Sequence, residues 1–231
     1  EMGMDKKGEI RNLSKIVKPE IAIITNISGA HFKNFNTLKD IAKAKSEIIE
    51  NISDGGTIIL NKDDKFFNFL SNKAKVKKIK IISFSSKKKA DISLLSIKRI
   101  KKLYKLKVII NKRVFYFKIS SSANNFINNI LACISVLYVL NLDLNKIKKK
   151  LINFTLPSGR GDIRIVKKFN KRFKFIDESY NANPLSMTSA IKNMHYYKKK
   201  KNTKKLVLLG DMLELGKKSK KLHKELSSII N

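Results

Sequence analysis

Acidic, amide and hydroxyl side chains are concentrated in one turn of this chain, residues 177–187. The turn follows the apolar run 173–176, which predicts a strand, and it precedes a helical pattern that begins at Pro184. In α/β proteins, ligands bind where strands end and helices begin. A second apolar run, 206–209, leads into a similar turn that carries Asp211 and Glu214. Carboxylate and amide side chains at the ends of two strands predict a small-molecule site.

The N-terminal half has the alternation of strands and helices that would hold such a site. Short apolar runs predict strands at 21–25, 57–60 and 79–84, and apolar residues at helical spacing predict a helix over 38–49. Strand, helix and strand in this order are typical of a parallel sheet.

In the middle of the chain the hydrophobic pattern changes from alternating strands and helices to consecutive strands. Alternating patterns predict strands at 93–100, 104–110 and 114–119 in a small antiparallel sheet, followed by helices over 124–140 and 144–152. Residues 157–161 have the composition of a linker, after which a strand (173–176), a helix (184–197), a strand (206–209) and a helix (219–230) are expected. The predicted fold class is α/β. We expect residues 1–156 to form a central, mostly parallel-sheet domain with a small antiparallel subsheet. We expect residues 157–231 to form the first part of a Rossmann-like domain.

Composition narrows the function classes. The 231 residues carry a net charge of +33, which favours nucleic acid or an anionic membrane as partner. The lysines are spread over the chain and accompany many Asn, Ile and Phe residues, so AT-rich codon usage also explains the charge. Aromatics do not interleave with the basic runs as a stacking platform requires. We therefore expect no nucleic-acid partner. The single Cys133 fits a reducing, cytoplasmic location, and the longest apolar run, 130–140, is too short for membrane insertion.

Several short motifs follow one another along the chain. They are Glu1-Met2-Gly3 with 8–10, Thr25-Asn26-Ile27 with Ala30-His31, the run 42–47, Asn61-Lys62-Asp63-Asp64, Asn124-Asn125 with Asn128, Gly159-Arg160, and Tyr-Asn-Ala-Asn-Pro at 180–184. In this order and spacing they resemble the Mur ligase family. The 180–184 motif resembles the branch that adds D-alanyl-D-alanine, since sister ligases carry a different turn there.

The resemblance implies an ATP-dependent ligase. Such enzymes phosphorylate a substrate carboxylate with ATP, releasing ADP, and an amine then attacks the acyl phosphate; positioning and magnesium do most of the catalysis. The implied cofactors are ATP and Mg²⁺. The implied partners are UDP-N-acetylmuramoyl-tripeptide and D-alanyl-D-alanine, in peptidoglycan synthesis by a cytoplasmic monomer.

The resemblance also implies a metal and catalytic set of Glu1, His31 and Lys45. Glu1 matches a magnesium-binding glutamate and His31 a residue at a second metal. Lys45 matches a lysine that the family carbamylates, which turns a cation into an anion with two oxygens. That reaction needs a neutral amine and hence a lowered lysine pKa. Lys43, on another face of the helix, is expected to be an ordinary surface lysine.

The remaining predicted site residues fall into two groups. For the nucleotide, the resemblance implies Asn26, Asn125, Asn128, Glu178 and the hinge residue Arg160, whose guanidinium suits a bidentate phosphate contact. For the incoming substrate it implies Asn181, Asn183, Asp211 and Glu214. Two positions depart from the family pattern: Asn124 stands in place of a histidine, and Glu178 in place of an aspartate.

No Gly-x-x-x-x-Gly-Lys-Ser/Thr phosphate loop occurs in the 231 residues. In the family this loop precedes the Glu1 motif, so we expect an internal fragment that is inactive alone. The alternatives are a sister ligase for another amino acid and, from a different class, a basic nucleic-acid-binding remnant. The sequence does not indicate the third residue of the acceptor peptide.

Overall fold

The computed structural model describes residues 1–29, 33–101, 103–120, 123, 126–196 and 204–230. The chain forms two compact units. The first comprises Glu1–Ile27 and Leu38–Thr155, and the second Ser28–Thr37 and Leu156–Asn231.

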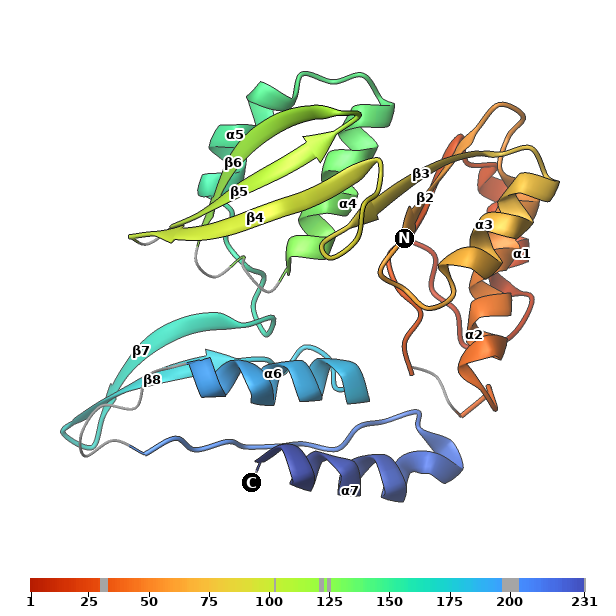
Figure 1. Cartoon of the computed structure of the whole chain (residues 1–231). Helices are drawn as coiled ribbons and strands as arrows, with labels where there is room; N and C mark the ends of the chain where they lie inside the picture. The colour runs from red at the N-terminus through yellow and green to blue at the C-terminus, as the bar shows by residue number, and fades with distance from the viewer. Residues whose placement is uncertain (30–32, 102, 121–122, 124–125, 197–203, 231) are drawn as a thin grey trace. The chain divides into compact units, whose positions relative to one another are not determined.

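A six-stranded mixed sheet organises the first unit, with its strands side by side in chain order (Figure 1). Its first four strands are parallel to one another, and the last two add antiparallel hairpins. The strands are β1 (Ile21–Ile24), β2 (Thr57–Asn61), β3 (Lys80–Ser85), β4 (Ile92–Ile100), β5 (Leu103–Ile110) and β6 (Arg113–Ser120).

Helices cover both faces of the parallel part (Figure 1). On one face lie α1 (Glu9–Val17), α2 (Leu38–Lys45), the 3-10 helix η1 (Ser46–Asn51) and α3 (Phe67–Val76). On the other, α4 (Ile127–Val139) packs against β2, β3 and β4, and α5 (Leu144–Ile152) packs against β6. Every residue of β2 is buried, as is typical of a parallel strand covered on both sides.

The main core fills the space between the sheet and α4. Its largest fully buried side chains include Phe84, Leu106, Phe117, Leu131 and Ile134. Each antiparallel strand contributes alternate residues to this core, as the two-residue period of a strand requires. Only one face of the β4–β6 subsheet is therefore buried.

The second unit contains the hairpin β7 (Asp162–Lys168) and β8 (Lys171–Asp177), the helices α6 (Pro184–Tyr196) and α7 (Ser219–Ile230), and the short 3-10 helix η3 (Gly216–Lys218). Its small core consists of Ile191, Met212, Leu215 and Leu226. The segment Ser28–Thr37 belongs to this unit, since the Lys33 amide donates to the Glu214 carbonyl at 2.7 Å.

The predicted α/β class, with its antiparallel subsheet, is confirmed. The sequence prediction missed α1, α3 and β7, and the helix predicted over 38–49 changes to 3-10 geometry at Ser46. The strand predicted at 206–209 is wrong. In the described part of the chain, β7 and β8 pair only with each other, and Leu206 and Leu208 are 79% and 84% exposed. An apolar run becomes a strand only where a neighbour supplies hydrogen bonds.

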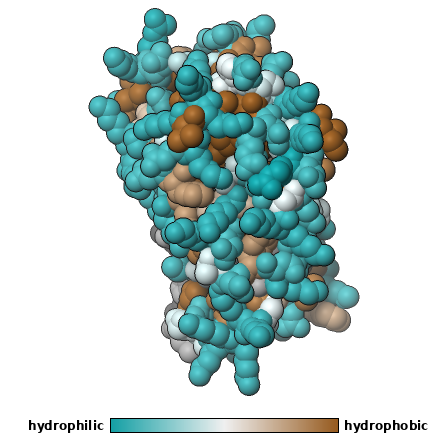
Figure 2. Space-filling model, turned by 90° about the vertical axis from the view of Figure 1, so that its right-hand side faces the viewer, coloured by the Kyte–Doolittle hydropathy of each residue, from teal (hydrophilic) through white to brown (hydrophobic). Residues whose placement is uncertain are grey.

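The face shown in Figure 2 is dominated by hydrophilic residues, with hydrophobic residues in small separate patches. None of the helices in the described ranges is both long and apolar enough to traverse a lipid bilayer.

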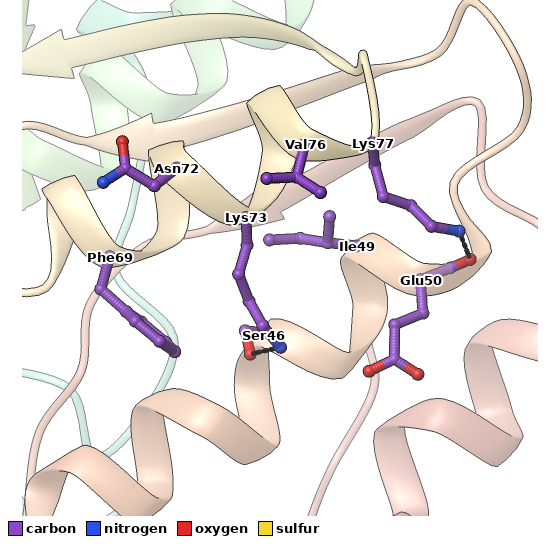
Figure 3. A pocket seen from close by; sticks show the side chains of 8 residues that line it. All are labelled: Ser46, Ile49, Glu50, Phe69, Asn72, Lys73, Val76 and Lys77. Carbon is purple, nitrogen blue, oxygen red and sulfur yellow. Dashed lines mark hydrogen bonds between the residues drawn. The ribbon is translucent and has the colours of Figure 1, made fainter.

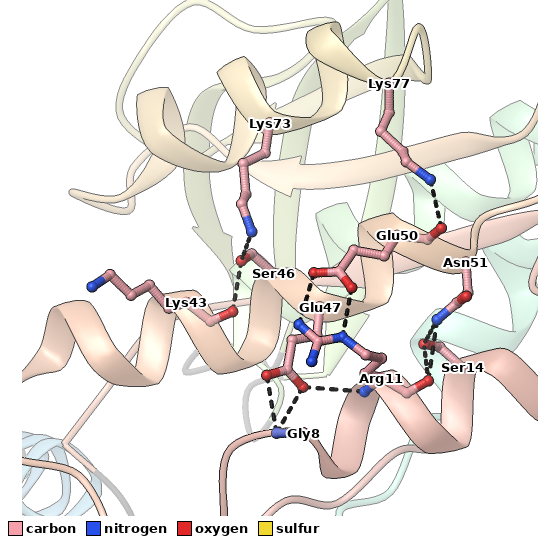
Figure 4. A network of polar contacts seen from close by, with 10 residues as sticks. All are labelled: Gly8, Arg11, Ser14, Lys43, Ser46, Glu47, Glu50, Asn51, Lys73 and Lys77. Carbon is pink, nitrogen blue, oxygen red and sulfur yellow. Dashed lines mark hydrogen bonds and ion pairs between the residues drawn. The ribbon is translucent and has the colours of Figure 1, made fainter.

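A buried carboxylate joins α1 to η1 (Figure 4). The side chain of Glu47 is only 2% exposed, and its oxygens accept hydrogen bonds from the Gly8 amide at 3.0 and 3.1 Å and from the Arg11 amide at 3.1 Å. These amides belong to the first turn of α1, where N–H groups have no partner within the helix. Beside it, Arg11 forms a more exposed ion pair with Glu50 at 2.6 Å.

Glu47→Ala should lower the free energy of unfolding by about 2–3 kcal/mol, because it leaves two partly buried amides without a charged acceptor. Chemical denaturation followed by circular dichroism measures this. Glu50→Ala is the matched control from the same 3-10 helix, and it should have a clearly smaller effect since its ion pair is exposed to solvent. Equal losses in the two variants would contradict a special role for Glu47.

Candidate functional site

The carboxyl ends of β1 and β2 are linked by side chains from the loops that follow them. Asn61, the last residue of β2, donates through Nδ2 to the Thr25 carbonyl at 2.9 Å. The Asp64 carboxylate accepts from the Ile27 amide at 2.7 Å and from the Phe66 amide at 2.8 Å. This is the edge of a parallel sheet at which α/β proteins bind ligands.

Lys45 lies at the same edge, at the last residue of α2. Its half-buried side chain donates from Nζ to the Asn26 carbonyl at 3.1 Å. Burial lowers the pKa of Lys45, and the opposing charge of Asp64 offsets only part of that effect. A buried amine that loses its proton more readily than a solvated one is a competent nucleophile. Lys43, in contrast, is exposed, as predicted.

The other members of the predicted metal set are not brought together by the described residues. Glu1 is exposed, with no hydrogen bond or ion pair to Lys45 or Asn26 in the described ranges. His31 lies outside the described residues. Within those residues, no cluster of three or more His, Cys, Asp or Glu side chains could hold a metal ion. The assignment of Glu1, His31 and Lys45 therefore stays a prediction.

Asn128, in the first turn of α4, has a buried acceptor without a partner. Its Oδ1 atom forms no hydrogen bond to any part of the chain that the structure describes. A buried amide oxygen in this state is available to a ligand that donates a hydrogen bond, such as an amino group. Asn124 and Asn125 lie outside the described residues.

In the second unit, the turn Gly159–Asp162 packs tightly against residues 177–180. The Gly161 amide donates to the Asp177 carbonyl at 2.6 Å, and the Tyr180 amide donates to the Gly159 carbonyl at 3.0 Å. The guanidinium of Arg160 stacks 3.9 Å from the centre of the Tyr180 ring. Such stacking orients the planar cation while its N–H groups stay available.

Both glycines are required in this turn. Gly159 and Gly161 have φ angles of +77° and +88°, and a Cβ atom on either would lie 3.0 Å from a neighbour. At Gly159 that neighbour is the Tyr180 backbone nitrogen, and at Gly161 it is a Glu178 carboxylate oxygen. Partial burial raises the pKa of Glu178, and the nearby carboxylates of Asp177 and Asp162 raise it further.

The predicted substrate residues of the 180–184 motif have different surroundings. Asn183 caps α6: its Oδ1 accepts from the amides of Leu185 at 3.1 Å and Ser186 at 2.9 Å. This is the hydrogen bonding expected of an N-cap residue. Asn181 is exposed on the same turn, so its side chain is accessible to a ligand.

Asp211 and Glu214 are both exposed, on a turn held by His223 of α7. His223 accepts from the Met212 amide through Nε2 at 3.0 Å, and its Nδ1 lies 2.9 Å from the Ser219 carbonyl. The ring thus bridges the Met212 amide and the Ser219 carbonyl. The role of His223 is therefore to position the Asp211–Glu214 turn, while Asp211 lies 3.7 Å from Nε2.

A hollow of about 410 Å³ lies elsewhere on the first unit, between η1 and α3 (Figure 3). Both of its lysines are engaged with the protein: Lys73 donates to Ser46 Oγ at 3.0 Å, and Lys77 to the Glu50 carbonyl at 2.7 Å. None of the predicted site residues lines it. The hollow is therefore separate from the candidate site.

Comparison with known proteins identifies the family. The family model described as the Mur ligase middle domain matches residues 1–137. The chain belongs to the Mur ligase family. Among curated proteins, it is similar to the UDP-N-acetylmuramoyl-tripeptide--D-alanyl-D-alanine ligase of Rickettsia prowazekii, with 35% identity over 98% of this chain and 49% of that protein. The same-named protein of Borreliella burgdorferi shows 34% identity over 98% of this chain and 46% of its own length.

Solved structures from the Mur ligase family agree with this assignment. MurF from Acinetobacter baumannii superimposes with a TM-score of 0.83 at 29% identity, covering 97% of this chain and 47% of that one. MurF ligase from Thermotoga maritima, solved in complex with ADP, gives 0.84 at 25% identity, covering 100% and 51%. The chain thus spans about half the length of the relatives it matches.

Two supporting residues of the site were missed by the sequence analysis. Asp64 was noted only as part of a motif, and Tyr180 only as part of a turn. The signal for Asp64 was its place directly after a buried strand. The signal for Tyr180 was an aromatic residue between two polar turns, which is a weaker indication.

Gly159→Ala should destabilise the second unit by more than about 1 kcal/mol, because alanine at a positive φ is strained and its Cβ would press on the Tyr180 backbone. Urea denaturation measures the change. Gly210→Ala is the matched control: its Cβ would meet nothing within 4 Å, so a change below about 0.5 kcal/mol is expected. A neutral Gly159→Ala substitution would show that the turn does not need its close packing.

Lys45 should become reactive toward acetic anhydride at lower pH than Lys43 on the same helix. The sign follows from burial, which disfavours the charged ammonium and so raises the neutral fraction of Lys45 at a given pH. Peptide mass spectrometry of samples acetylated briefly across a pH series gives both profiles from one experiment. A Lys45 profile that coincides with that of Lys43, or lies at higher pH, would contradict the burial argument.

Proposed function

We propose that this chain is part of an ATP-dependent ligase that joins D-alanyl-D-alanine to UDP-N-acetylmuramoyl-tripeptide in peptidoglycan synthesis. The observation that carries the proposal is the half-buried Lys45 amine at the carboxyl ends of β1 and β2, in a chain similar over nearly its whole length to ligases of that name.

Lys45 acts in this proposal as a carbamate. Its neutral amine attacks CO2, so that a C–N bond forms while one C=O π bond of CO2 breaks. The nitrogen then loses a proton to water, which leaves a carbamate anion with two oxygens. The lowered pKa of Lys45 favours this step because a protonated amine has no lone pair. Asp64, whose carboxylate is held by the Ile27 and Phe66 amides, limits how far the pKa falls and fixes the loop around Lys45.

Magnesium prefers oxygen ligands, and the groups that would hold it are the Lys45 carbamate and Glu1, with His31 at a second metal, as the family resemblance implies. Bound there, magnesium would neutralise charge on the phosphates and the substrate carboxylate. A lysine without its carbamate would repel a cation, so this assignment requires the carbamate. Glu47 contributes indirectly, because it ties α1, and so the segment that carries Glu1, to the helix that follows Lys45.

Asn128 and Arg160 provide nucleotide contacts in this proposal. The unpartnered Asn128 Oδ1 suits the amino group of adenine, with Asn125 and Asn26 as further polar groups. Arg160 is held flat by Tyr180 and presents its N–H groups to phosphate. Glu178 accepts from the ribose in its ionised form, and Asn181, Asn183, Asp211 and Glu214 contact the incoming dipeptide. The reaction releases ADP and phosphate, and the enzyme acts in the cytoplasm.

The full-length protein should release phosphate from ATP only when both UDP-N-acetylmuramoyl-tripeptide and D-alanyl-D-alanine are present. Lys45→Ala should reduce kcat on the order of 100-fold or more, the cost of removing one preorganised charged group. Added short carboxylates should partly restore it, and Lys43→Ala, the matched control, should retain activity.

Each result separates the alternatives. Phosphate release that depends on a single amino acid instead of the dipeptide would identify a sister ligase. Full activity of Lys45→Ala would remove the carbamate from the mechanism. No phosphate release with any of these substrates would refute the proposed function.

A further inference from the structure

The β4–β6 subsheet leaves one face open to solvent, and that face is basic. The opposite face packs on α4 and α5 (Figure 1). The outer face carries cross-strand rows set by the strand register. In one row, Lys98, Lys105 and Lys118 stand directly opposite one another, and all three are exposed. The next row is Ser96, Lys107 and Tyr116.

Exposed apolar residues flank the lysine row on both sides. Ile100, at one end of the face, and Val114, at the other, are each 46% exposed, and Tyr116 is 48% exposed. We call these residues, together with the four lysines of the two rows, the basic face. It thus combines cations with aliphatic and tyrosine side chains on one surface.

No acidic residue balances this charge locally. Residues 92–120 contain nine Lys and Arg residues and no Asp or Glu. Codon usage accounts for abundant lysine throughout the chain, whereas the strand register gathers these lysines on one face of the subsheet. Like charges directly opposite in an antiparallel pair are destabilising. The row Lys98–Lys105–Lys118 therefore costs stability in the isolated protein, and an anionic partner would relieve that cost.

The side chains of the basic face favour a lipid surface over a nucleic acid. Single-stranded nucleic acids bind where several aromatic rings stack with successive bases. Tyr116 is the one aromatic residue on this face within the described ranges, and its ring is already covered by the Lys105 ammonium at 4.5 Å. Lysine, tyrosine and aliphatic side chains together suit the boundary between lipid headgroups and acyl chains.

We propose that the basic face is a peripheral docking surface for an anionic lipid bilayer. The lysine ammonium groups bind lipid phosphates, and Ile100, Val114 and Tyr116 enter the headgroup region. The attachment is electrostatic and reversible, and it needs no membrane-spanning segment. Membrane docking involves none of the residues of the proposed catalytic site. Its test is therefore independent of the proposed function.

Sedimentation of the full-length protein with vesicles tests this proposal. Binding to phosphatidylcholine vesicles that contain phosphatidylglycerol is expected, with little binding to pure phosphatidylcholine and a loss of binding as salt is raised. The triple variant Lys98→Gln, Lys105→Gln, Lys118→Gln should partition about 100-fold more weakly, at roughly 1 kcal/mol per lysine near an anionic surface. Its melting temperature should be equal to or above that of the wild type, because the repulsion has been removed.

The matched control is Lys15→Gln, Lys75→Gln, Lys80→Gln, which removes the same charge from exposed positions elsewhere in the first unit. It should bind vesicles within a few-fold of the wild type. Equal weakening by both triple variants would show that net charge alone attracts the protein, which would overturn the proposal. A wild-type protein that does not bind anionic vesicles would also overturn the proposal. So would a wild-type protein that uses the same three lysines to bind single-stranded RNA more tightly than it binds vesicles.

Discussion

The buried carboxylate of Glu47 is the interaction on which the geometry of the first unit depends. A carboxylate on a residue that is only 2% exposed is tolerated only with strong hydrogen-bond donors around it, and here the donors are amides at the start of α1. Because Glu47 follows Lys45 by two residues, the same contact fixes the end of α2 relative to the chain's first residues. The position of Lys45 in the candidate site thus depends on the hydrogen bonds that Glu47 accepts at the start of α1.

Burial of the Lys45 amine and the nearby negative charge of Asp64 together determine the pKa of Lys45. Full burial without Asp64 would make the amine neutral but also costly, and full exposure would leave it protonated. The half-buried position beside Asp64 lies between these limits. In a chain with 51 Lys and Arg residues, position therefore distinguishes a reactive lysine from its many solvated neighbours.

Much of the fold could be predicted from apolar periodicity. The strands that became β1 to β6 were all recognised, since runs such as 57–60 are either buried on both sides or alternate cleanly. The weakly amphipathic α3 was missed because only Leu70, Ser71 and Ala74 face the interior. The run 206–209 was misassigned because hydrophobicity predicts burial, whereas a strand needs a pairing partner, which local sequence does not reveal.

The sequence predicted which residues belong to the candidate site, but not which residues they contact. Lys45 and Arg160 were recognised through motifs, yet their partners Asp64 and Tyr180 come from other elements, and only the fold brings them together. The same holds for the basic face: the lysines are evident in the sequence, but the register that aligns Lys98, Lys105 and Lys118 is a property of two hairpins. A single-residue slip of β5 would turn Lys105 toward the core and Leu106 toward solvent. Burial of Leu106 and Phe117 against α4 therefore keeps the lysines on the outer face, so the hydrophobic core itself determines where the positive charge is displayed.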